Sequence, residues 1–146
     1  AELRKSGPAL IVGILAGSIT ASGCAVGFAW LGGASTETLL SIAPKSVTAP
    51  IAMGIAEQLG GLPSLTAVLV ILTGITGALF GPLVLNLVRI KDWRARGLAL
   101  GVASHGIGTA RALQVNPIAG AFAGLAMGLN GLATAILLPL IFALVF

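Results

Sequence analysis

The chain has 146 residues, of which 57% are hydrophobic and only 8% are charged, and its formal net charge is +4. A soluble domain carries about a quarter charged residues because its surface faces water. Eight Lys and Arg and four Asp and Glu side chains are too few to cover a globule of this length. The composition therefore excludes an ordinary soluble protein, and the few, clustered basic residues argue against a nucleic-acid-binding surface.

Three long segments of the chain carry no charged residue, namely 6–36, 58–88 and 112–146. A helix needs about 20 apolar residues to cross a hydrocarbon layer of ~30 Å. Each segment is long enough, so we predict membrane-spanning helices at residues 7–31, 64–88 and 118–146. A buried core helix of a soluble protein would explain one such segment, but three without a polar face favour a membrane.

Two further apolar stretches, 37–59 and 97–117, are interrupted in the middle by polar and helix-breaking residues. The first interruption is the proline-flanked segment 44–50, and the second is the glycine-rich segment 104–109. Irregular backbone at membrane depth is tolerated only where protein buries it or where it lines a cavity. We therefore look for a functional site at these two breaks.

The basic residues help to choose between two arrangements of the broken stretches. They cluster in Arg4-Lys5 and in 89–96, and short loops rich in Lys and Arg mark the cytoplasmic side. If both clusters are cytoplasmic, the two broken stretches are re-entrant hairpins that enter from opposite sides. If both stretches cross completely, the clusters lie on opposite faces. We favour the hairpins because they keep both clusters inside.

A repeat accompanies the two breaks. Gly74-Ile75-Thr76-Gly77 interrupts the span after the first break, and Gly128-Leu129-Asn130-Gly131 interrupts the span after the second. The units 37–88 and 97–146 then have opposite orientations, and inverted repeats with interrupted helices are typical of transporters. Coincidence in a chain with 21 glycines is the alternative. We predict an all-α integral membrane protein of one domain (1–146), with three spans and two re-entrant hairpins, arranged as in an elevator-like transporter.

Lys45 is the charged residue of the first break. A charge at membrane depth is costly and usually marks a pathway, an ion pair or a ligand site. Ser46 and Thr48 follow it, and freed N–H groups at the start of the second arm favour an anion. We therefore predict that these three residues bind an anionic substrate. The alternative is that the lysine extends to the membrane interface from a shallower hairpin.

The second break supplies the facing half of the predicted site. Glycines let the backbone approach a ligand closely, and hydroxyl and amide groups suit a carboxylate; the residues concerned are Ser104, Gly106, Gly108 and Thr109. His105 either contacts the substrate and titrates near neutral pH or bonds a hairpin carbonyl as a structural residue. Arg111 either binds a carboxylate through two hydrogen bonds or anchors the hairpin at the interface.

Thr76 and Asn130 complete the predicted binding residues, although such side chains also form hydrogen bonds between helices. One His and one Cys are too few ligands for a metal site. Ser104 and His105 are neighbours on irregular backbone, which does not suit a nucleophile and its base. We therefore predict no enzyme activity, no metal and no cofactor.

At this point the sequence resembles a known family, the bacterial LrgB family. Six segments in order carry the resemblance over essentially the whole chain: 44–53, 63–67, 97–101, 103–109, 120–122 and 124–129. Members of this family are longer, so the chain resembles their C-terminal part.

The resemblance implies a multi-pass protein of the bacterial inner membrane that forms oligomers and acts with a small LrgA-like membrane protein. LrgB-like proteins are described as antiholin-like modulators of murein hydrolases and lysis. Related proteins, among them the plastidal glycolate/glycerate translocator, move small carboxylates. We therefore expect a transporter of small monocarboxylates, with an antiholin-like regulator as the alternative. The plastid form departs from Pro44-Lys45-Ser46, so the role of Lys45 rests on the residues alone.

Overall fold

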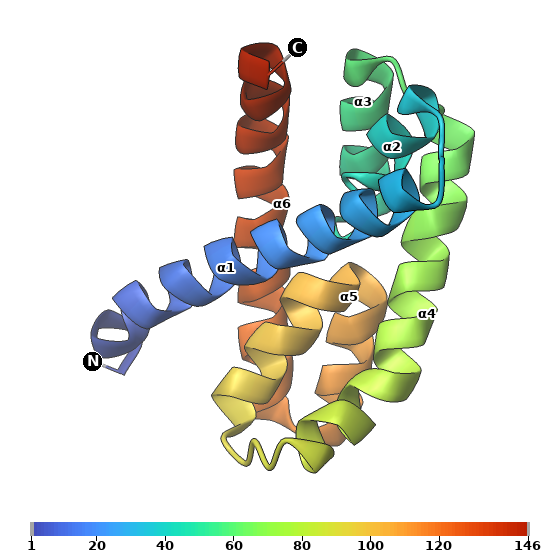
Figure 1. The fold of residues 1–146 in the computed structure, drawn as a ribbon. Coiled ribbons are helices and arrows are strands. Elements are labelled where there is room, and N and C mark those ends of the chain that lie inside the picture. Colours follow the sequence, from blue (N-terminus) through green and yellow to red (C-terminus); the bar gives the residue numbers. More distant parts are fainter. Residues whose placement is uncertain (1, 146) are drawn as a thin grey trace.

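The structure is a computed structural model that describes residues 2–145, and within them it consists of helices without any strand (Figure 1). The helices are α1 (Glu2–Leu31), α2 (Thr36–Ile42), α3 (Ala49–Leu59), α4 (Pro63–Leu87), α5 (Trp93–Val115) and α6 (Pro117–Val145). The all-α prediction is confirmed.

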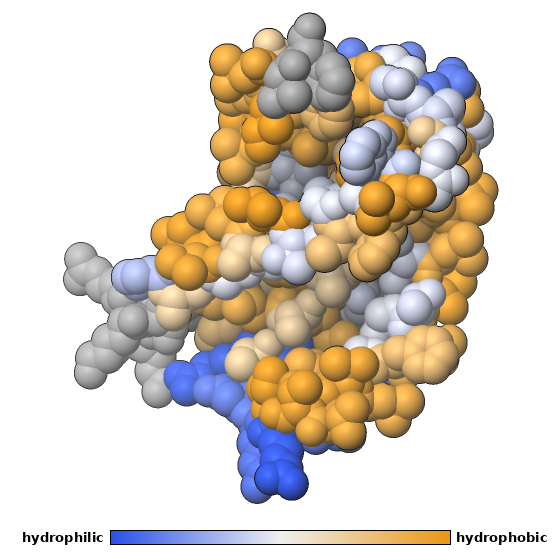
Figure 2. Space-filling view, in the orientation of Figure 1, coloured by the Kyte–Doolittle hydropathy of each residue, from blue (hydrophilic) through white to orange (hydrophobic). Residues whose placement is uncertain are grey.

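Three of these helices are long and apolar enough to cross a membrane, over Gly7–Leu31, Pro63–Leu87 and Pro117–Leu144. They match the three predicted spans, and two begin one residue earlier because proline suits the first helical turn. Large apolar side chains such as Phe80, Leu83 and Leu140 are exposed on them. Apolar residues cover much of the visible surface, and hydrophilic residues gather towards two opposite ends (Figure 2). Such a surface fits a lipid bilayer.

The first predicted break is a helix–turn–helix in the structure. Helix α2 ends at Ile42 and α3 begins at Ala49, with Thr48 as the N-cap and Pro50 in the first turn. The chain reverses between them, so that α2 and α3 lie side by side (Figure 1). Pro50 suits the first turn of α3, where its missing N–H has no partner to lose, so the second helix begins here.

The Ser41 side chain locks the outer part of this hairpin to α4. Its Oγ accepts a hydrogen bond of 2.7 Å from the N–H of Leu62, and its carbonyl accepts one of 2.9 Å from Thr66 Oγ1. Both side chains are fully buried. These bonds hold the end of α2 against the start of α4.

The second predicted break is a reversal inside α5. His105 has φ 41° and ψ −130°, which is not helical. Eight residues of straight helix span about 12 Å, yet a Cβ placed on Gly108 would lie 2.5 Å from the Leu100 carbonyl oxygen. Helix α5 is therefore two arms, 93–104 and 106–115, folded back on each other (Figure 1).

The two glycine motifs do not interrupt their helices, and this part of the prediction needs correction. Helices α4 and α6 run through residues 74–77 and 128–131 without a break. A glycine weakens a helix by only ~1 kcal/mol relative to alanine, which packing offsets. Gly74 lies against His105 and Gly77 against Ser104. The α4 motif therefore provides a close contact with the tip of α5.

Helices α1 and α6 pack against the first arm of α5 from other sides. Gly13 and Gly17 of α1 lie against Leu98 and Val102. On α6, the Ala119 and Ala123 carbonyls occupy the space that side chains at Gly97 and Gly101 would need. Helix α1 crosses the molecule obliquely (Figure 1).

Asp92 starts α5 and lies in the basic loop outside the spans. Its carboxylate accepts a 2.8 Å hydrogen bond from the Arg94 N–H and forms an ion pair with the guanidinium at 2.9 Å. Hydrogen bonds from Arg94 lower the pKa of this carboxyl below its usual value. The stabilisation is therefore present at neutral pH and is lost as the pH falls through that lowered pKa.

Asp92→Ala is expected to lower the melting temperature by a few degrees, because the α5 cap is lost. Asp92→Asn keeps the cap, so its melting temperature at neutral pH is expected to be close to that of the original protein. Unlike the original protein, the variant should not lose this stabilisation in acid. Thermal unfolding of both variants between neutral and acidic pH measures this. Equal destabilisation by the two substitutions would contradict the capping role.

Candidate functional site

Asn130 of α6 connects the two breaks. Its Nδ2 donates hydrogen bonds to the carbonyls of Ser46, at 3.3 Å, and of Val102, at 3.4 Å. Ser46 belongs to the first break, and Val102 lies three residues before the reversal at His105. The Asn130 side chain is 1% exposed. The two predicted breaks therefore meet at one buried amide.

His105 is held by α4 and by its own hairpin. Its Nε2 lies 2.9 Å from the Val70 carbonyl, and since a carbonyl only accepts, this nitrogen carries the hydrogen. Thr109 Oγ1 donates a 2.8 Å bond to the His105 carbonyl. Both side chains are buried. These contacts support the structural role for His105 and leave Nδ1 as its second polar atom.

Lys45 lies at the tip of the first hairpin and is partly buried. Its ammonium donates a 3.2 Å hydrogen bond to Ser46 Oγ, and the Ser46 carbonyl accepts from Asn130, which also contacts the second break. The positive charge therefore lies at the place where the first break faces the second.

Two side-chain oxygens at this place have no hydrogen-bond partner among the described residues, Ser104 Oγ and Asn130 Oδ1. Their residues are 0% and 1% exposed. A buried polar group without a partner costs about 1–3 kcal/mol, and such groups are few in native proteins. One of them lies one residue before the reversal at His105 and the other on the side chain that contacts both breaks, so a ligand, an ion or water can complete the hydrogen bonding there.

Two helices also begin at this position. The second arm of each hairpin, α3 and residues 106–115, starts at a break, and Thr48 makes no side-chain bond to the first turn of α3. The N-terminus of a helix carries a partial positive charge and free N–H groups. Together with Lys45, these ends favour a small anion.

The structure brings together several of the predicted residues, namely Lys45, Ser46, Ser104, His105, Thr109 and Asn130, while Thr48 is the N-cap of α3 two residues beyond Ser46. Gly108 packs inside its own hairpin and shapes the tip, and Gly106 is exposed beside it. Thr76 is exposed on α4, and Arg111 is exposed with a 3.5 Å bond to Gln114. Thr76 and Arg111 therefore lie outside the buried cluster.

Sequence reasoning missed three contributors to the cluster: the Val70 carbonyl and the contact positions Gly74 and Gly77. The two glycines are three residues apart and therefore share one face of α4. This spacing was a signal of a close helix contact.

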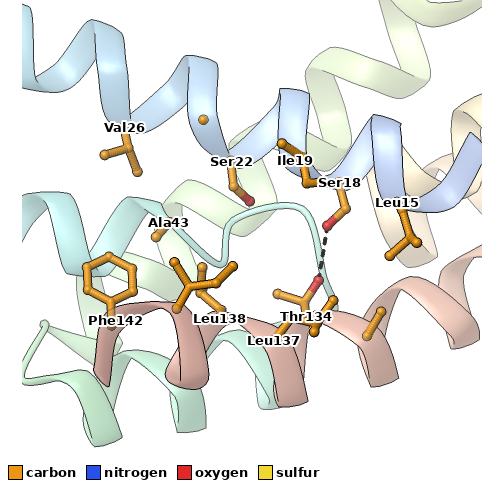
Figure 3. Close-up of a pocket in the computed structure, with 13 residues that line it drawn as sticks. Leu15, Ser18, Ile19, Ser22, Val26, Ala43, Thr134, Leu137, Leu138 and Phe142 are labelled. Atoms are coloured by element: carbon orange, nitrogen blue, oxygen red, sulfur yellow. Dashed lines mark hydrogen bonds between the residues drawn. The ribbon is translucent and has the colours of Figure 1, made fainter. Parts of the chain in front are cut away.

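A cavity of about 280 Å³ adjoins the first break between α1 and α6 (Figure 3). Apolar side chains such as Leu15, Ile19 and Leu137 line most of it, and Ala43 places it next to the break. A 3.3 Å hydrogen bond between the Ser18 and Thr134 hydroxyls crosses from α1 to α6 (Figure 3).

These features define a helical membrane protein with two helix breaks that meet at a buried polar cluster. The model of the LrgB-like family matches residues 1–144, and the chain belongs to this family. An uncharacterized protein of Haemophilus influenzae is 40% identical over 114 residues, which are 78% of this chain and 49% of that protein. The protein YwbG of Bacillus subtilis is 38% identical over 90% of this chain and 59% of its own length.

The holin-like protein CidB of Staphylococcus epidermidis is 34% identical over 78% of this chain and 50% of that protein. The chain therefore spans about half the length of these curated relatives. No solved structure matches it.

Proposed function

We propose that this chain forms the substrate-binding part of a transporter of small monocarboxylates in the bacterial inner membrane. The observation that carries the proposal is the meeting of the two helix breaks at the buried Asn130 amide, with Lys45 bonded to Ser46 in the first break and the Ser104 hydroxyl buried without a partner in the second. A substrate carboxylate accepts hydrogen bonds from the Ser104 hydroxyl and the Lys45 ammonium. Charge-assisted hydrogen bonds of this kind are roughly twice as strong as neutral ones.

A single carboxylate fits the charge of the site. Lys45 is the one ionised side chain of the buried cluster, since Arg111 lies exposed outside it. A second carboxylate would be buried without a counter-charge, which is costly at low dielectric constant. The substrate class is therefore a small acid with one negative charge, such as glycolate or pyruvate.

The proposed topology is a pair of re-entrant hairpins in inverted repeats, 37–88 and 97–146. Reciprocal contacts support it. The span after the first break, α4, packs its Gly74 and Gly77 against the second break. The span after the second break, α6, contacts the first break through Asn130 and through Gly131, which lies against Ile51. A pseudo-twofold axis in the membrane plane predicts such an exchange.

An antiholin-like regulator is the second candidate, because relatives such as that of Staphylococcus epidermidis carry the name holin-like. In this role the chain would form an oligomer with an LrgA-like partner. A regulator of leakage has no need of a buried charge and unpartnered oxygens at two opposed breaks, whereas a carrier needs a site of this kind. The site therefore favours the transporter.

Ligand-dependent thermal stability of the purified, complete protein tests the binding site. Glycolate, lactate and pyruvate are expected to raise the melting temperature saturably, since a ligand stabilises the state that binds it. The neutral amide glycolamide is expected to have no effect. Ser104→Ala should weaken the response to the acids, while Arg111→Gln, outside the cluster, should keep it. No response to any acid, or an equal response to the amide, would contradict the proposal.

A further inference from the structure

We propose that Asn130 and the main-chain carbonyls of Ser46 and Val102 form a Na⁺ site, and that the cation binds together with the carboxylate. The joint binding of cation and carboxylate rests on the proposed function, whereas the cation site does not. It assigns the coupling ion of the transporter to three oxygens at the meeting point of the breaks.

The Ser46 carbonyl is free of the helical hydrogen-bond ladder because Ser46 lies two residues before Thr48, the N-cap of α3. In a helix the carbonyl of residue i accepts from the N–H of residue i+4, and four residues after Ser46 stands a proline without an N–H. The next helical bond of this turn is the one from Ala52 to the Thr48 carbonyl, at 2.9 Å. The Ser46 carbonyl instead points to Asn130.

The Val102 carbonyl is freed by the reversal at His105. It belongs to the last four carbonyls of the first α5 arm, which have no partner within that arm. It also points to the Asn130 amide. Two separate helix breaks thus release one carbonyl each towards the same side chain.

The Asn130 amide satisfies this arrangement poorly. Its bonds to the two carbonyls are 3.3 and 3.4 Å long, whereas N–H···O bonds are usually about 2.9–3.0 Å. Its own oxygen is buried without a partner. Rotating the amide by half a turn exchanges Nδ2 and Oδ1 with almost no change in shape. Three oxygens then converge, which is favourable only with a cation between them.

The ligand set selects a monovalent cation. All three oxygens are neutral, and Glu37, Glu57 and Asp92 are exposed and outside the cluster. A divalent ion buried among neutral oxygens would keep most of its charge uncompensated. Freed carbonyls at discontinuous helices coordinate Na⁺ in transporters of this general build.

Lys45 makes binding of the cation and of the acid interdependent. A cation at Asn130 and the Lys45 ammonium both border the break and repel each other in a medium of low dielectric constant. A carboxylate at the break attracts both and offsets the repulsion. Each ligand therefore raises the affinity for the other by the same factor.

The test uses the complete, purified protein and measures its melting temperature in NaCl, KCl and choline chloride at equal ionic strength, with and without glycolate. Na⁺ alone is expected to stabilise the protein, and saturating glycolate should lower the half-saturating Na⁺ concentration by about 10-fold, within the usual range of such coupling. Asn130→Asp should also lower the half-saturating Na⁺ concentration, because the substitution adds a negative charge beside the cation. Asn130→Leu should abolish the Na⁺ response.

The matched control is Thr134→Val, one turn along α6, where the side chain is also buried but bonds to Ser18. It should keep the Na⁺ response. If Asn130→Leu does not fold, the test rests on Asn130→Asp. A half-saturating Na⁺ concentration equal to that of the original protein would then overturn the cation site. If glycolate raises the melting temperature equally in NaCl, KCl and choline chloride, the cation site is also overturned and water occupies the position beside Asn130. The proposed carboxylate site would be unaffected by that result. A Na⁺ response without any response to acids supports the cation site and contradicts the proposed substrate.

Discussion

Gly77→Ala is expected to destabilise the protein strongly, although alanine is the better helix former. A Cβ at residue 77 would overlap Ser104 Oγ and lie 2.7 Å from Ser104 Cβ. Ser104 is fully buried at the tip of α5, and because its Cβ is fixed by the backbone, rotating its hydroxyl would not remove the overlap. Overpacking of this kind costs about 1–3 kcal/mol or more, against a gain in helix propensity of ~1 kcal/mol.

The control for this substitution is Gly128→Ala on α6, where nothing lies within 4 Å of the added Cβ. It should be neutral or slightly stabilising. The double variant Gly77→Ala/Ser104→Gly removes the overlap and should recover part of the lost stability. Melting temperatures of the three variants in the same detergent test the contact between α4 and α5. A Gly77→Ala protein as stable as Gly128→Ala would show that the tip of α5 is not seated on α4.

Lys45→Met is expected to reduce uptake of small acids by at least about 30-fold, because truncating one member of a buried charged pair costs about 2–5 kcal/mol. The same change is expected to keep or raise the stability of the protein without ligand. A partly buried ammonium is costly to hold at membrane depth, and methionine has a similar shape without the charge.

Uptake by vesicles and melting temperature, measured on the same Lys45→Met preparation, separate these two effects. Lys91→Met serves as control, since Lys91 is exposed in the loop between α4 and α5 and should change neither quantity. A Lys45→Met protein that melts much lower and loses uptake in proportion would assign Lys45 a structural role. Normal uptake would remove it from the site.

The parts of the fold that the sequence predicted are those with local causes. The spans are defined by segments without charged residues that are long enough, as helices, to cross a membrane. The proline-flanked polar segment 44–50 marks the first break, and the cluster of glycines and polar residues around His105 marks the second. These signals need no knowledge of the neighbouring helices, and the predicted spans and break positions agree with the structure.

The composition of the site depends on helix packing, which a single sequence does not contain. Thr76 lies two residues from Gly74 and therefore about 200° around α4, away from the face that contacts His105. Arg111 is beyond the first turn of the second α5 arm and faces outwards. The bond from His105 to the Val70 carbonyl joins residues 35 positions apart. Only the docking of α5 on α4 determines such contacts.

Transport by the complete protein with its proposed LrgA-like partner in lipid vesicles tests the central claim most directly. Vesicles loaded with unlabelled glycolate, in buffer containing Na⁺, are supplied with labelled glycolate and, separately, with labelled sucrose. A carrier with a site between the breaks predicts saturable accumulation of labelled glycolate by exchange, loss of it in Lys45→Met, and no passage of sucrose. Unsaturable entry of both solutes, unchanged by Lys45→Met, would contradict the transporter and favour a holin-like pore.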